Sequence, residues 1–162
     1  MGKPETCKCR YSHCLHDDRT LLKSDAVRVG NQYYHKDCYE EIKTIGEIVD
    51  YFAKECNPDV VFPALKNVIN SIVHPKDKPG ISPERLLFQV KHFCTHGHMI
   101  RHPGGLYYAI QDRASYEAYE EYKAKQRVGN YDFNTVEEDL DLSQSRKVRI
   151  KKQKSFEDIL GG

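Results

Sequence analysis

Four residues near the N-terminus are of the types, and stand at the spacings, that hold a metal ion. Cys9 and Cys14 form one pair, and His35 and Cys38 form a second pair twenty residues further along the chain. A structural zinc ion takes four ligands in a tetrahedron, and thiolates and imidazoles supply them as two pairs, each brought together by a tight turn or a helix start. The sequence therefore predicts one structural zinc ion bound by Cys9, Cys14, His35 and Cys38.

The second pair is the more specific of the two. His35 and Cys38 are three residues apart and share one side of the first turn of a helix that begins there. The residues before them fit a short β-hairpin, with strands over residues 25–29 and 32–34 and a turn at Gly30-Asn31. We therefore expect His35 and Cys38 at a junction between a strand and a helix.

The first pair has three nearby rivals. Four residues separate Cys9 from Cys14, which is more than the usual two, and Cys7, His13 and His16 stand close enough to replace either ligand. Aliphatic residues are few in this segment, so metal binding is expected to supply much of its folding free energy.

The middle of the chain has the periodicity of helices. Apolar residues recur there at intervals of three and four, which predicts helices that pack on one core. The first expected helix covers residues 39–56, the second begins at Pro58 and ends at residue 74, and the third begins at Ser82 with the serine as its cap.

After a break at residues 103–105, residues 106–110 fit a short strand or a helical turn, and Asp112 can cap a last helix through Gln126. The expected fold is mainly α. Residues 1–41 form a zinc finger with a short β-hairpin, residues 42–127 a helical domain of about four helices, and residues 128–162 a disordered tail.

Composition and charge limit the function classes. Lys and Arg number 25 and Asp and Glu number 24 among 162 residues, so net charge alone predicts neither a nucleic-acid partner nor an acidic one. No apolar run has the length of a signal peptide or a membrane span. We therefore expect a cytoplasmic protein with no membrane partner, in a reducing compartment where cysteines bind metal.

The expected tail is acidic and then basic, and it ends in an apolar cluster. The basic residues could neutralise the phosphates of a nucleic acid. They are Arg146, Lys147, Arg149, Lys151, Lys152 and Lys154. The apolar residues Phe156, Ile159 and Leu160 stand at positions i, i+3 and i+4, so they would share one face of a short helix on docking to a partner protein.

The N-terminal segment resembles the zinc-finger segment of small proteins carried by phages and mobile elements of Gram-positive bacteria. The resemblance rests on CRYSHCLH at residues 9–16 and YYHKDCYE at residues 33–40, and the second half is also similar to LIM-like and treble-clef fingers. It continues more loosely at residues 67–70, 86–88, 105–108 and 154–160. The resemblance implies a phage or mobile-element protein in a bacterial host and implies no reaction.

A second group of histidines stands late in the third expected helix and in the loop that follows it. His92, His96, His98 and His102 lie within eleven residues, and His92 and His96 would share a helical face that could hold a second metal. No glutamate follows His92 as a metalloprotease pattern requires, so a polar helix end is the favoured interpretation.

Catalysis has weak support in the sequence. His13 and His16 stand beside Asp17 and Asp18, which would suit a metal-dependent nuclease, but a closed tetrahedral site leaves no position for a reactive water. We therefore predict a non-enzymatic protein that binds a host or phage protein, with a nucleic-acid-binding protein as the alternative and a metal-dependent nuclease as the second alternative.

Overall fold

The computed structural model describes residues 5–129, and its N-terminal part contains two small antiparallel hairpins. Strand β3 (Val27–Val29) pairs with β4 (Gln32–Tyr34), and Gly30 in the turn between them has a φ of 60°, which favours glycine. This hairpin lies where the sequence predicted it.

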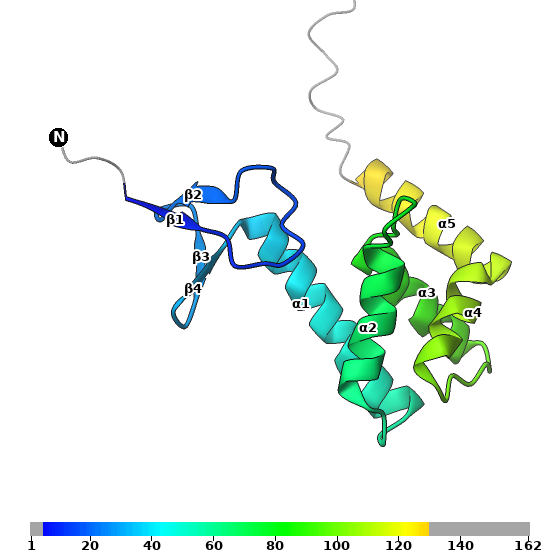
Figure 1. Cartoon of the computed structure of the whole chain (residues 1–162). Helices are drawn as coiled ribbons and strands as arrows, with labels where there is room; N and C mark the ends of the chain where they lie inside the picture. The colour runs from blue at the N-terminus through cyan, green and yellow to red at the C-terminus, as the bar shows by residue number, and fades with distance from the viewer. Residues whose placement is uncertain (1–4, 130–162) are drawn as a thin grey trace, which may run out of the picture. The chain divides into compact units, whose positions relative to one another are not determined.

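The other hairpin was not predicted. Strand β1 (Thr6–Lys8) pairs with β2 (Thr20–Leu22), with Cys7 opposite Leu21 (Figure 1). Each strand has three residues, and the loop between them is too long to give the signal of a tight turn.

Helix α1 (Lys36–Tyr51) belongs to both hydrophobic clusters found within residues 5–129. It begins three residues earlier than predicted, directly after His35, and continues into a π-helical turn over Phe52–Cys56. Near its start, Cys38 and Ile42 pack with residues of the finger, whereas Ile48 and later residues pack in the helical core. One continuous helix therefore joins the two parts.

Helix α2 (Phe62–Val73) begins four residues later than predicted. Residues 57–61 form a turn instead, in which the side-chain oxygen of Asn57 accepts the N–H of Asp59 at 2.9 Å. The proline in the first turn of α2 is Pro63 and not Pro58, so the predicted start was wrong.

The remaining helices follow the predicted order. Helix α3 (Pro83–Thr95) begins at its cap Ser82, whose side chain accepts the N–H of Arg85 at 3.3 Å. A 3-10 turn over Pro103–Gly105 leads into α4 (Leu106–Gln111), so the segment that fitted a strand or a helical turn is helical. The last helix of the described residues, α5 (Arg113–Gly129), extends three residues beyond its predicted end.

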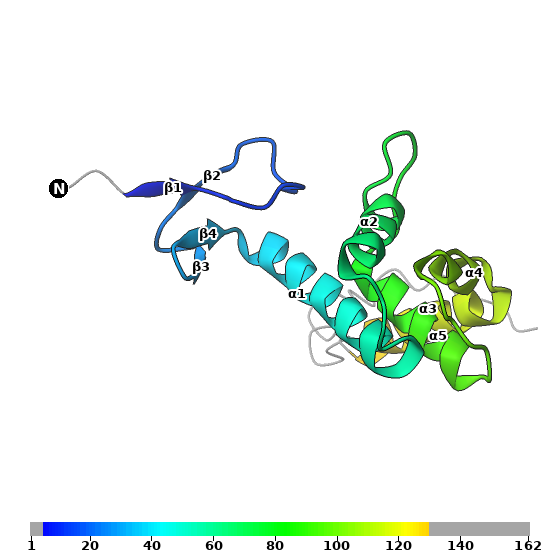
Figure 2. The same ribbon diagram turned by 60° about the horizontal axis from the view of Figure 1, so that its bottom comes forward.

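The helical core is built mainly from side chains of α1 and its π-helical turn, α2, α3 and α4. Figure 2 shows the backbone of these helices. Phe52, Leu65, Ile69, Leu86 and Leu106 are each fully buried in it. The prediction of a mainly α chain with a small hairpin-containing finger is confirmed. None of the helices within residues 5–129 is long and apolar enough to cross a membrane.

The finger and the helices up to Gln126 group into one compact unit. The division of this unit at residue 41 stays a prediction. The predicted tail features, from Arg146 to Lys154 and from Phe156 to Leu160, lie outside the described residues.

Candidate metal centre

The four predicted ligands come together at one point of the finger. One ligand atom from each of Cys9, Cys14, His35 and Cys38 lies within 4.8 Å of all the others. The Cys14 and Cys38 sulfurs are 3.8 Å apart, and Nδ1 of His35 is 3.5 Å from the Cys14 sulfur and 3.8 Å from the Cys38 sulfur. This arrangement can hold a metal ion.

Strand pairing and the start of α1 position these side chains. Cys9 directly follows β1, where its N–H donates to the carbonyl of Arg19 at 2.8 Å and its backbone bridges to Tyr33. His35 is the last residue before α1 and Cys38 lies in the first turn, as the spacing predicted. Cys9 and Cys38 are 2% and 0% exposed, whereas Cys14 and His35 are half-buried.

The three rival residues have other contacts. The thiol of Cys7 donates to the carbonyl of Leu21 at 3.7 Å, and the ring of His13 stacks on the ring of His74 at 4.2 Å. None of the rivals, His16 included, belongs to the cluster of four.

His16 contacts the edge of the cluster. Its Nε2 is 2.8 Å from Oδ2 of Asp37, and its ring lies 4.0 Å from the ring of His35. His16 and Asp37 also form a second group of close ligand atoms with Cys38, but both of these side chains are exposed. Since Cys38 is common to both groups, the second group is an outer layer of the first and not a separate centre.

The thiols of the cluster differ in acidity. Burial raises the pKa of Cys9, but the backbone N–H groups of Tyr11 and His35 donate to its sulfur and lower the pKa overall. Burial and the neighbouring thiols of Cys14 and Cys9 raise the pKa of Cys38 to about 12, against the opposing N–H of Leu15. Without a cation, the cluster therefore keeps a proton on Cys38 at neutral pH.

The histidines of the second group do not form a metal centre among residues 5–129. Nδ1 of His92 lies 3.0 Å from the buried hydroxyl of Ser115, the His96 ring stacks on His92 at 3.9 Å, and the His98 ring stacks on Phe93 at 4.2 Å. His102 precedes the 3-10 turn at residues 103–105.

Sequence reasoning missed a polar cluster beside the metal centre. Oε1 of Glu41 in α1 lies 2.7 Å from the Tyr11 hydroxyl and 2.7 Å from Nε2 of His74, which follows α2. A carboxylate only accepts, so both partners donate to Glu41. The three residues lie on segments that are far apart in the chain, and no local spacing predicts their contact.

No protein-family model, curated protein or solved structure matches the chain.

Proposed function

We propose that this protein is a non-enzymatic zinc protein in which a zinc ion holds the N-terminal finger on α1, and in which the helical surface binds a host or phage protein. The observation that carries the proposal is the cluster of Cys9, Cys14, His35 and Cys38, in which Cys9 and Cys38 are buried.

Zinc is the metal that best suits this cluster. Thiolate and imidazole ligands suit zinc, whereas Mg²⁺ and Ca²⁺ prefer oxygen. In a tetrahedron with zinc–sulfur bonds of about 2.3 Å and zinc–nitrogen bonds of about 2.1 Å, two sulfurs lie about 3.8 Å apart and a sulfur and a nitrogen about 3.6 Å apart. The distances of 3.8, 3.5 and 3.8 Å within the cluster agree with this geometry.

The number of ligands supports a structural role for the zinc. Four protein ligands fill a tetrahedral site, so no position is left for the water that a metal-dependent nuclease needs.

Three cations of the finger meet acceptors within the chain. Lys23 pairs with Glu5 at 2.9 Å, and the guanidinium groups of Arg19 and Arg28 donate to the carbonyls of Ser12 and Gly30. These three cations therefore do not by themselves form an unopposed stripe for phosphates.

The helical part has exposed side chains of the kinds found at protein interfaces. Met99 is 73% exposed and Tyr108 is 70% exposed, and both line a shallow pocket together with Arg101 and His102. Methionine, tyrosine and arginine are enriched at the centres of protein interfaces. This surface is the contact area that we propose for the partner.

The metal content of the purified chain and of four single variants tests the zinc centre. We expect one zinc per chain by plasma mass spectrometry, retained in the controls Cys7→Ser and His16→Ala and lost in Cys38→Ser and His35→Ala. Purified, unchelated protein without zinc, or controls that lose zinc as the ligand variants do, would overturn the proposal.

Affinity capture from bacterial lysate treated with nuclease tests the partner. The same host or phage protein should be captured by the unmodified chain and by the control Val29→Glu, but not by Met99→Glu or Tyr108→Glu. A capture that disappears with nuclease in every chain would instead support the nucleic-acid alternative.

A further inference from the structure

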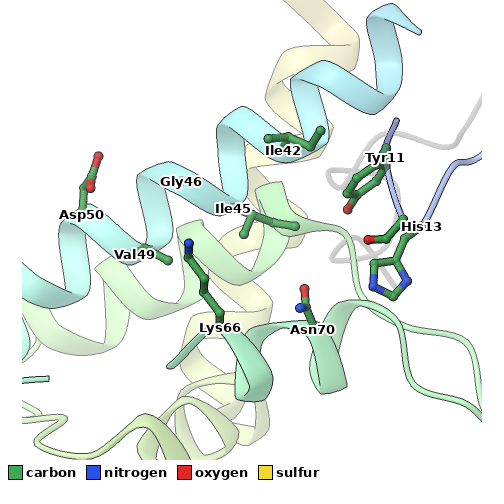
Figure 3. Close-up of a pocket in the computed structure, with 10 residues that line it drawn as sticks. Tyr11, His13, Ile42, Ile45, Gly46, Val49, Asp50, Lys66 and Asn70 are labelled. Atoms are coloured by element: carbon green, nitrogen blue, oxygen red, sulfur yellow. The ribbon is translucent and has the colours of Figure 1, made fainter. Parts of the chain in front are cut away.

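A cleft of about 400 Å³ lies between α1, α2 and the loop that joins Cys9 to Cys14 (Figure 3). Ile42, Ile45 and Val49 of α1 form an apolar wall, and Tyr11 and His13 of the loop close one end. Its volume is in the range of sites for small molecules. The three segments meet here because the Tyr11 hydroxyl and the His13 ring contact Glu41 and His74.

One cation lies beside this apolar wall. The side chain of Lys66 in α2 extends toward α1 in Figure 3, and it forms no ion pair with any residue from 5 to 129. The polar side chain of Asn70 lies one helical turn further along α2, and Asp50 stands at the end of the cleft away from Tyr11. A negative group beside Lys66 would therefore meet an ammonium that has no ion pair within residues 5–129.

A glycine in the middle of α1 keeps the cleft open. Glycine in a helix interior is less favourable than alanine by about 1 kcal/mol. A Cβ atom at Gly46 would meet no atom within 4 Å, so packing does not require glycine there. Gly46 does line the cleft, and a larger side chain at this position would occupy it. Gly46, which has a low helix propensity, therefore lies at a position where a larger side chain would fill the cleft.

We propose that this cleft binds a small organic anion with an apolar body. The apolar body lies on Ile42, Ile45 and Val49, and a single carboxylate or sulfonate group lies against Lys66. The site goes beyond the proposed function, and it depends on the zinc centre only because the loop with Tyr11 and His13 runs between two of the metal ligands.

Titration of the zinc-loaded full chain with 8-anilinonaphthalene-1-sulfonate tests the site, because this probe carries an apolar body and one anionic group. We expect saturable fluorescence that corresponds to one molecule per chain. Lys66→Met should weaken the affinity about tenfold, the usual size of one lost charge contact. Lys43→Met is the matched control, since Lys43 is an exposed residue of α1 that does not line the cleft.

A second pair of variants tests the space. Gly46→Leu should abolish probe binding by filling the cleft, whereas Glu47→Leu adds the same side chain one position further along α1, outside the lining, and should leave binding unchanged. Circular dichroism and zinc content verify that each variant is folded.

The neutral probe N-phenyl-1-naphthylamine separates anion recognition from apolar adsorption. Its binding should respond to Gly46→Leu and not to Lys66→Met. Equal responses of the two probes to Lys66→Met, or unchanged sulfonate binding in Gly46→Leu, would overturn the proposal. If the purified, unchelated chain contains no zinc but Lys66→Met and Gly46→Leu still weaken sulfonate binding as expected, the zinc proposal is contradicted and the anion site is supported.

Discussion

The hydroxyl of Tyr11 donates a 2.7 Å hydrogen bond to the carboxylate of Glu41, and this contact joins the loop between two metal ligands to α1. Tyr11 is 8% exposed, and burial followed by the neighbouring Glu41 carboxylate raises its pKa. The hydroxyl therefore stays protonated and donates throughout the physiological pH range. A metal ion bound by Cys9 and Cys14 would hold the same loop at a second point.

Removal of this hydroxyl should destabilise the zinc-loaded protein. A hydrogen bond to a charged group contributes about 1.5–3 kcal/mol, and Glu41 keeps its second donor, His74, so we expect Tyr11→Phe to cost about 1.5 kcal/mol. Urea unfolding measures the loss. Tyr108→Phe is the control because that side chain is 70% exposed, and an equal midpoint for both variants would show that the Tyr11 bond contributes nothing.

The parts of this molecule that sequence could predict are those specified by local spacing. One helical turn brings His35 and Cys38 together, and a Gly-Asn turn connects the strands of the β3–β4 hairpin. The cap at Ser82 marks the start of α3. Each of these signals lies within a few residues, so a single sequence contains it.

The parts that sequence could not predict depend on contacts between distant segments. Strand β1 pairs with β2 across a loop without turn signals. In the polar cluster, Glu41 and His74 contact Tyr11 although they lie 30 and 63 positions further along the chain. The start of α2 was missed for a different reason. Pro58 and Pro63 both suit a first helical turn. The earlier segment is a turn, in which the side-chain oxygen of Asn57 accepts the N–H of Asp59 and the carbonyl of Asn57 accepts the N–H of Val60.

Gly80 before α3 should tolerate no side chain. A Cβ atom there would lie 1.7 Å from the carbonyl oxygen of Val73 and 2.5 Å from its carbon, both of them backbone atoms at the end of α2. Gly80→Ala must therefore shift the backbone, and we expect a loss of about 3 kcal/mol. Gly104→Ala is the control, since a Cβ there meets nothing within 4 Å. Similar thermal midpoints for the two variants would contradict the close approach at Gly80.

Asp112 should stabilise α5 in a pH-dependent way. Its Oδ2 accepts the N–H of Ser115 at 2.8 Å and the Ser115 hydroxyl at 2.6 Å, and these hydrogen bonds lower the pKa of the carboxyl group below its usual 3.8. Since the folded pKa is lowered, the stabilisation is fully present above pH 3.8 and is lost as the pH falls through the folded pKa. Asp112→Ala should cost about 1 kcal/mol at pH 7 and less below pH 3.8. Urea unfolding at both pH values measures the difference, and a cost that does not fall in acid would show that the ionised cap contributes nothing.

Zinc binding should release protons. The pKa of Cys38 in the metal-free cluster is about 12, so this thiol is protonated at neutral pH and must lose its proton to bind zinc as a thiolate. The affinity should therefore rise with pH, about tenfold per unit for each proton released.

Isothermal titration calorimetry in two buffers of different ionisation enthalpy at the same pH counts the protons, and we expect at least one per zinc. Cys7→Ser should release the same number as the unmodified chain, because its thiol donates to the carbonyl of Leu21 and stands outside the cluster. Heats that do not depend on the buffer would mean that Cys38 does not bind the metal as a thiolate, and a smaller proton count in Cys7→Ser would place Cys7 among the ligands.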